Sequence, residues 1–165
     1  MTALFTAQVA SAQSCIKQQD LADAVVFTMP IAYQTFSEKC AGQLAQDGFV
    51  AREGDAFAAG FSGLQDDTWP GAYSFFKSLP QKESGEDEMS DLFDNLPAEV
   101  MRPIFELIIA EKLSGEIKVQ DCSKIEQIIE PLGPLPPENF GTLVARIFNL
   151  IPGKSGPEIC RENAP

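Results

Sequence analysis

The fold depends on residues 15–46, which read CIKQQDLADAVVFTMPIAYQTFSEKCAGQLAQ. Apolar side chains recur at helical spacing on both sides of Pro30, so this stretch predicts helical structure. Proline has no amide hydrogen, and its ring pushes the preceding residue, Met29, towards extended geometry. We therefore expect the helix to break at Met29-Pro30, which leaves two helices over about 20–28 and 30–46.

The four cysteines are Cys15, Cys40, Cys122 and Cys160. None belongs to the closely spaced pairs that are typical of zinc sites, so two disulfides are favoured over metal or redox chemistry. Four buried free thiols in a reducing compartment are the alternative. Of the three possible pairings we expect Cys15–Cys40 and Cys122–Cys160, because each would close a helical hairpin. The first pairing needs the break at Pro30, since a straight helix would hold its Cα atoms about 37 Å apart and a disulfide needs about 7 Å or less.

The N-terminal segment predicts export. Residues 1–12 carry no charge and end in Ala10-Ser11-Ala12, the pattern of small residues that signal peptidase requires. We expect residues 1–12 to be the remainder of a signal peptide and 13–165 to form a single domain in the periplasm or outside the cell. A frayed, alanine-rich N-terminus is the alternative. A lipid-modified Cys15 is less favoured, because no leucine stands in the three residues before it.

The rest of the chain predicts further short helices, several of them bounded by proline or glycine. Their approximate bounds are Asp55 to Leu64, Asp67 to Leu79, Ala98 to Leu113, Asp121 to Leu132 and Pro137 to Leu150. No stretch shows the alternation of a β-strand, and no long repeat is visible. The sequence therefore predicts an all-α fold: an irregular bundle of six or seven short helices, punctuated by proline and stabilised by two disulfides.

One segment is strongly acidic. From Glu83 to Asp94 there are six acidic residues and no basic residue. We expect residues 81–91 to form a solvated loop between two halves of the domain, or a hinge between them. A calcium site is less favoured, because the acids do not follow the ligand spacing of an EF-hand loop.

Composition excludes several functions. The chain has 165 residues, 12 basic against 24 acidic, and a formal net charge of −12. Nucleic acids and anionic lipid surfaces would repel such a chain. It contains no histidine, which removes the usual general base and the commonest metal ligand. No apolar stretch is long enough to cross a membrane, and we expect no cofactor, no metal and no nucleic acid partner.

Catalysis is weakly indicated. The sequence Gly60-Phe61-Ser62-Gly63 resembles a nucleophile elbow, but no histidine is present to accept the proton. Helix packing through small residues explains it better. Glu106 and Glu111 interrupt an apolar helix and are candidates for a carboxylate-dependent hydrolase, although they also fit the polar face of that helix.

Aromatic residues offer a candidate binding site. The chain has 12 Phe but only 2 Tyr and 1 Trp, so most rings lack a polar group and favour burial. If the core is incompletely filled, a pocket for an apolar ligand or a partner helix is expected at Phe57, Phe61, Trp69, Tyr73 and Phe76.

These observations favour an exported, non-enzymatic binding or interaction module, whose partner is a protein or an apolar small molecule. Basic partners are electrostatically favoured. The alternatives are a carboxylate-dependent hydrolase of the cell envelope, which would show a carboxyl of raised pKa in a cleft, and a structural subunit, which would show a large apolar surface patch.

Overall fold

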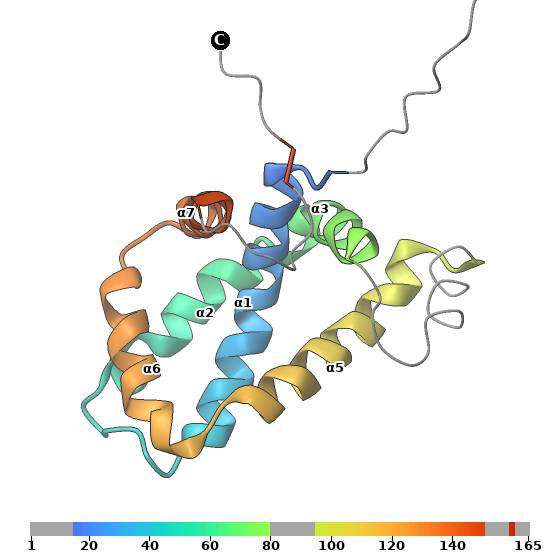
Figure 1. The fold of residues 1–165 in the computed structure, drawn as a ribbon. Helices are drawn as coiled ribbons and strands as arrows, with labels where there is room; N and C mark the ends of the chain where they lie inside the picture. Colours follow the sequence, from blue (N-terminus) through green and yellow to red (C-terminus); the bar gives the residue numbers. More distant parts are fainter. Residues whose placement is uncertain (1–14, 80–94, 151–158, 161–165) are drawn as a thin grey trace, which may run out of the picture.

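The computed structural model describes residues 15–79, 95–150 and 159–160, and there the chain forms an irregular bundle of six α-helices (Figure 1). They are α1 (Gln18–Cys40), α2 (Asp55–Ser62), α3 (Gln65–Ser78), α5 (Ala98–Glu116), α6 (Cys122–Ile129) and α7 (Pro137–Leu150). A π-helical turn, η1 (Val50–Gly54), leads into α2, and the 3-10 turns η2 (Val119–Asp121) and η3 (Glu130–Leu132) flank α6. The only β-type pairing in these residues is an isolated parallel bridge between Ile16 and Ile159. The predicted all-α bundle with two disulfides is confirmed.

Helix α1 is the centre of the bundle. It packs against α2, α3, α5 and α7 and runs between them in Figure 1. Contrary to our expectation, it continues unbroken through Pro30 for 23 residues. Its buried residues lie on both sides of the proline: Leu21, Ala22, Ala24, Val26 and Phe27 before it, and Tyr33, Phe36 and Cys40 after it.

Tertiary packing explains why the helix does not break. A proline in a helix interior costs about 3 kcal/mol, whereas each large apolar side chain that is buried contributes about 1.5–3 kcal/mol. Breaking α1 would remove one half of it from the core. A side chain also joins the two helices close to the proline, because Gln65 Nε2 in α3 donates a hydrogen bond to the Phe27 carbonyl of α1 at 3.1 Å.

The predicted disulfide pairing is wrong. Cys15 is bonded to Cys160, with Cα atoms 4.8 Å apart, and Cys40 is bonded to Cys122, with Cα atoms 5.7 Å apart. Because α1 is continuous, Cys15 lies before its first turn and Cys40 is its last residue, so the two lie at opposite ends of the helix. The first bridge joins the two ends of the described chain, where the Cys160 amide donates to the Ile16 carbonyl at 2.8 Å.

Other helix boundaries agree with the sequence to different degrees. Helix α7 has the predicted bounds. Helix α5 extends three residues beyond the predicted Leu113, to Glu116. Helix α3 begins at Gln65, before the predicted Asp67, and holds Pro70 inside. Pro70 is the sixth residue of that helix, past its first turn, so it removes one intrahelical hydrogen bond, and burial of Trp69 and Ala72 on either side offsets this cost.

Glycine permits close packing between α1 and α7. A Cβ atom at Gly141 would lie 2.7 Å from the Ala22 carbonyl oxygen and 2.7 Å from Val26 Cγ2. Both of those atoms belong to α1. The two backbones therefore approach more closely at this point than any larger residue would allow.

Two predictions fall outside the described residues: the signal peptide at 1–12 and the acidic loop at 81–91. Within the described part of the chain, no helix is both long and apolar enough to span a membrane.

Candidate binding site

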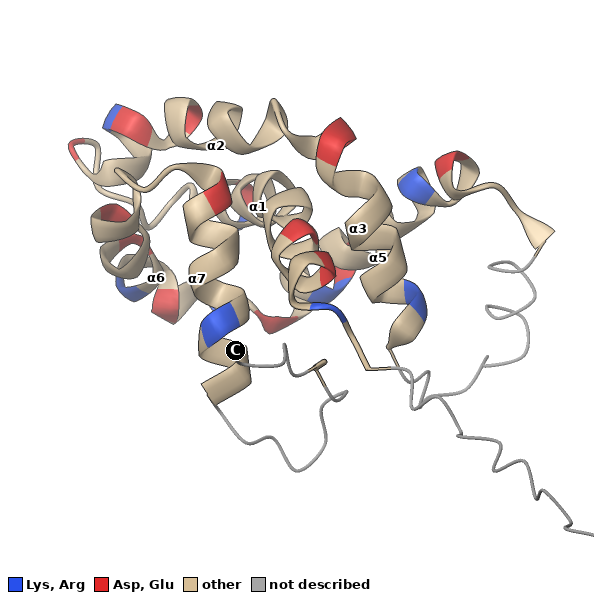
Figure 2. Ribbon diagram, turned by 90° about the horizontal axis from the view of Figure 1, so that it is seen from above, with Lys and Arg blue, Asp and Glu red and all other residues tan. Residues whose placement is uncertain are grey.

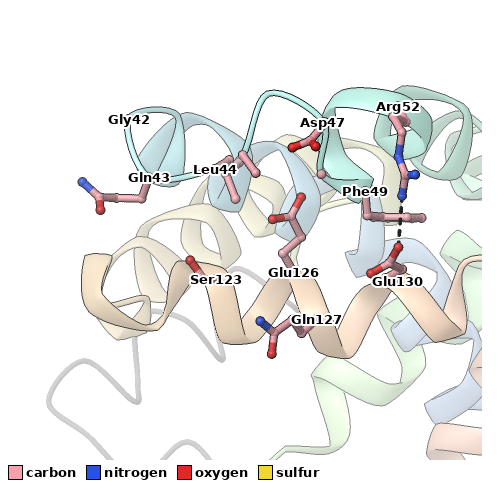
Figure 3. A pocket seen from close by; sticks show the side chains of 12 residues that line it. Gly42, Gln43, Leu44, Asp47, Phe49, Arg52, Ser123, Glu126, Gln127 and Glu130 are labelled. Carbon is pink, nitrogen blue, oxygen red and sulfur yellow. Dashed lines mark hydrogen bonds and ion pairs between the residues drawn. The ribbon is translucent and has the colours of Figure 1, made fainter.

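A pocket of about 520 Å³ lies between α6 and the segment that follows α1 (Figure 3). One wall is residues 42–52, and the other is the face of α6 with the first residue of η3. Its lining is mainly polar, from Gly42, Gln43, Leu44, Ala45, Asp47, Gly48, Phe49, Arg52, Ser123, Glu126, Gln127 and Glu130. A volume of this size is within the range of small-ligand pockets in proteins.

The Cys40–Cys122 disulfide lies at the base of both walls. Cys40 ends α1 directly before one wall, and Cys122 begins α6 directly before the other. Both cysteines are 0% exposed and pack with Phe36 in a small apolar cluster. The covalent bond therefore fixes the distance between the two walls where they begin.

Glu126 is the buried polar residue of this pocket. Its side chain points from α6 towards the facing loop (Figure 3), and the residue is 8% exposed. The Val50 amide donates a hydrogen bond to its Oε1 at 3.0 Å. Val50 is the first residue of η1, where amide hydrogens lack helical partners, so Glu126 caps this turn from a different helix. Among the described residues, no group donates to its other oxygen, Oε2, which is not one of the fully buried atoms without a partner and is therefore open to solvent or to a ligand in the pocket.

Gly48 makes room for this carboxylate. A Cβ atom at Gly48 would lie 2.9 Å from Glu126 Cδ and 3.0 Å from Oε2. The absence of a side chain at this position therefore allows the loop to close over Glu126. By contrast, a Cβ atom at Gly42, in the same wall, would meet nothing within 4 Å.

Charges in the pocket are unbalanced. Three acidic residues line it, Asp47, Glu126 and Glu130, against one basic residue, Arg52. Arg52 Nη2 donates to Glu130 Oε1 at 3.0 Å, and both side chains are 53% exposed. This pair lies at one edge of the pocket in Figure 3. Asp47 and Glu126 therefore contribute negative charge that no basic side chain of the lining neutralises.

The negative charge of the pocket also affects Tyr33 of α1. Burial raises the pKa of the Tyr33 phenol above its ordinary value of 10.0, and the negative charges of Asp55 and Glu126 raise it further. The phenol is therefore neutral at physiological pH and leaves the negative potential of the carboxylates unchanged.

Comparison with known protein families, curated proteins and solved structures finds no match to this chain.

The pocket has the chemistry of a site for a positively charged group. Its acceptors are carboxylates and the side-chain carbonyls of Gln43 and Gln127, with the hydroxyl of Ser123. In the described part of the chain, no group of three or more Cys, Asp or Glu side chains is gathered so as to hold a metal ion. The acceptors are therefore spread along the walls.

The aromatic residues that the sequence suggested as a pocket do not form one group. Phe57 and Phe61 belong to a cluster with Tyr33, Phe49 and Phe140. Trp69, Tyr73 and Phe76 belong to another cluster, with Phe27 and Phe105. Rings within each cluster contact one another, such as Phe57 with Phe61 at 5.0 Å and Trp69 with Tyr73 at 5.4 Å between centroids. An apolar ligand at these residues stays a prediction.

The suggested hydrolase carboxylates, Glu106 and Glu111, lie five residues apart on α5. Glu106 accepts a hydrogen bond from Arg102 Nε at 3.2 Å, one turn away on α5. Arg102 also bonds Asp66 at 2.6 Å, so it links α5 to α3. Glu111 is exposed on α5. A raised carboxyl pKa occurs instead at Asp23 of α1, where burial is the main cause and the charge of Asp20 adds to it.

Two other surface features stand apart from the pocket. A hollow between α1 and α5 contains Lys39, whose Nζ donates to the Ser114 carbonyl in the last turn of α5. Helix α7 exposes Leu143, Ile147 and Leu150 at 41%, 44% and 80%. The structural-subunit alternative predicts a large apolar surface patch, and it stays a prediction.

Sequence reasoning missed Glu126 and Gly48. One signal for Glu126 was present: it follows Cys122 by four residues, so it lies on the same face of α6. If Cys122 forms a disulfide, that face points into the molecule, and an acid on it needs a specific partner. No comparable signal identified Gly48, because its contact partner lies 78 residues away in the sequence.

Proposed function

We propose that this chain is an exported, non-enzymatic binding module that holds a positively charged group of a protein partner in the pocket between residues 42–52 and α6. Export is supported by the two disulfides, which persist outside the reducing cytosol. The observation that carries the proposal is Glu126, a residue 8% exposed whose Oε2 accepts no hydrogen bond within the described chain.

Burial of most of the Glu126 side chain removes part of the hydration of its carboxylate, although Oε2 keeps contact with solvent. One amide donor compensates part of that loss. A cation that enters the pocket would supply the rest and would meet the further negative charge of Asp47. The site would therefore gain most from a ligand that brings both positive charge and hydrogen-bond donors.

Long-range electrostatics favours the same kind of partner. The chain has a net charge of −12, and acidic residues occur on helices all around the view in Figure 2. Such a surface attracts basic partners and raises their association rate, and salt weakens both effects.

The test is a titration of the oxidised, isotopically labelled chain with a short, end-blocked peptide that contains both Lys and Arg, followed by the amide signals of Gly48, Val50 and Glu126. We expect saturable shifts at these amides and weaker binding as salt is raised from about 0.05 to about 0.5 M. Glu126→Gln keeps the hydrogen bond to Val50 but removes the charge, and it should weaken binding about tenfold or more.

Glu111→Gln is the matched control, because it makes the same change in net charge at an exposed position on α5. It should leave binding almost unchanged. If the peptide does not bind, or if both variants reduce binding equally, the pocket is not the binding site and the proposal fails.

A further inference from the structure

We infer that the positively charged group is a guanidinium, presented as an arginine side chain on a peptide segment of the partner. This inference rests on the proposed function and narrows its ligand.

The spacing of the acceptors favours a guanidinium over a compact cation. Glu126 of α6 and Glu130, which follows the end of that helix, are four residues apart, which corresponds to about 6 Å along a helix axis. Asp47 lies on the facing loop in Figure 3. A planar guanidinium has five donors that point in several directions, whereas an ammonium is a point charge that holds its water more strongly. Separated acceptors are thus better satisfied by arginine than by lysine.

The molecule already holds one guanidinium at this site. Arg52 reaches from η1 across to Glu130, the first residue of η3, at 3.0 Å. The pair is half exposed, so it is open to competition from solvent and from another cation. A ligand arginine at Glu126 would lie beside Arg52, and the two positive charges would repel each other. Arg52 therefore opposes the ligand, and its removal should strengthen binding.

The pocket also has an apolar part. Leu44 is partly buried in the wall formed by residues 42–52 and packs against the cluster around the Cys40–Cys122 disulfide. The methylene groups of an arginine side chain can lie along such a residue while the charged end reaches Glu126. A peptide is favoured over free arginine as the source, because the α-carboxylate of the free amino acid would be repelled by the acids of the pocket and by a net charge of −12.

The experiment compares four ligands by amide-shift titration of the oxidised full chain: end-blocked glycine-rich peptides with a central Arg, Lys or citrulline, and free L-arginine. Citrulline has nearly the shape of arginine but no charge. We expect the Arg peptide to bind at least about fivefold more tightly than the Lys peptide and than free arginine, with no saturable shift from citrulline.

Variants test whether the Arg peptide binds in this pocket. Gly48→Ala should displace the Glu126 carboxylate and weaken binding of the Arg peptide about tenfold, whereas Gly115→Ala, in the last turn of α5 and outside the pocket, should leave it unchanged. Arg52→Ala should strengthen binding about threefold or more. Circular dichroism and the dispersion of the amide signals show whether each variant is folded. In addition, Arg52→Ala is expected to increase the affinity for the peptide, which a misfolded protein would not do.

The outcomes separate this inference from the proposed function. If the Lys and Arg peptides bind equally at the pocket, the guanidinium is excluded but a site for basic partners stands. If free arginine binds more tightly than the Arg peptide, the partner protein is excluded and a small guanidinium ligand stands. If no ligand shifts the pocket amides, both are overturned.

Discussion

The close packing of α1 against α7 depends on Gly141, which has a hydrogen atom where other residues have a side chain. Its neighbours across the α1–α7 interface include backbone, which cannot rotate away as a side chain can. We expect Gly141→Ala to lower the free energy of unfolding by about 1–3 kcal/mol through overpacking. Urea unfolding followed by circular dichroism measures the change.

The control for that substitution is Gly115→Ala. Gly115 lies in the last turn of α5, and a Cβ atom there would meet nothing within 4 Å. Alanine has the higher helix propensity, so this variant should be as stable as the wild type or up to about 1 kcal/mol more stable. Equal effects from the two variants would show that contact with α1 is not the cause.

Asp23 makes stability depend on pH. Its pKa is raised above the ordinary 3.8, mainly by burial, so the ionised carboxylate is less favourable in the folded than in the unfolded chain. Protonated Asp23 favours the folded chain. Its contribution to the free energy of unfolding is therefore present below the ordinary pKa and is lost as the pH rises through the raised pKa of the folded state. We therefore expect Asp23→Asn to stabilise the protein at about pH 7 and to have no such advantage at about pH 3.

Asparagine can still accept the hydrogen bond that Gln19 Nε2 donates to Asp23 Oδ1 at 2.8 Å. Urea midpoints at the two pH values measure the difference, and Glu111→Gln again controls for the loss of one charge. An advantage of Asp23→Asn that is the same at both pH values would contradict this explanation.

Among the helices, α1 shows the clearest conflict between local backbone preference and tertiary packing. It keeps a proline at position 30 because burial on both sides of it outweighs the local cost. Pro30→Ala should restore an amide donor and remove the steric conflict, and we expect it to stabilise the protein by about 1–2 kcal/mol after the greater freedom of the unfolded chain is counted. Thermal unfolding of the oxidised chain tests this, and a loss of stability would show that α1 depends on the shape that Pro30 gives it.

Helices α7 and α1 show how far sequence alone could predict the fold. The bounds of α7 were predicted correctly because its apolar spacing is uninterrupted and Pro136-Pro137 marks its start. The break at Pro30 was a local inference that tertiary contacts overruled. The disulfide pairing depended on that break, so it failed with it.

The pocket could be predicted only in part. The position of Glu126 relative to Cys122 is local and was available from helical periodicity. The meeting of α6 with the loop that holds Gly48 and Val50 depends on contacts between residues more than 70 positions apart. A single sequence does not contain that distance information.

For the molecule as a whole, the two disulfides differ in access. Cys40 and Cys122 are 0% exposed, whereas Cys15 is exposed and Cys160 is partly exposed. Because a thiolate must reach a sulfur atom to reduce the bond, we expect Cys15–Cys160 to be reduced first in the folded protein. Brief reduction, alkylation and peptide mapping should recover the modified pair Cys15 and Cys160 while Cys40–Cys122 stays intact.

Each bridge is expected to stabilise the fold by about 4–5 kcal/mol through the unfolded chain, because each closes a long loop, of 145 and 82 residues. Reduction of Cys15–Cys160 should therefore lower the unfolding midpoint, while Cys40–Cys122 still holds the two walls of the pocket together. Early modification of Cys40 and Cys122 would contradict the difference in access.

The bond between Cys15 and Cys160 also determines how the protein responds to mechanical force. A force applied to the chain before Cys15 and after Cys160 passes directly from one sulfur to the other, because the bond joins the two ends of the loop that contains the helices. The bundle then carries almost none of the tension. Under reducing conditions the same pull would be transmitted to the first turn of α1, so stretching measured with and without reductant should give two very different extensions.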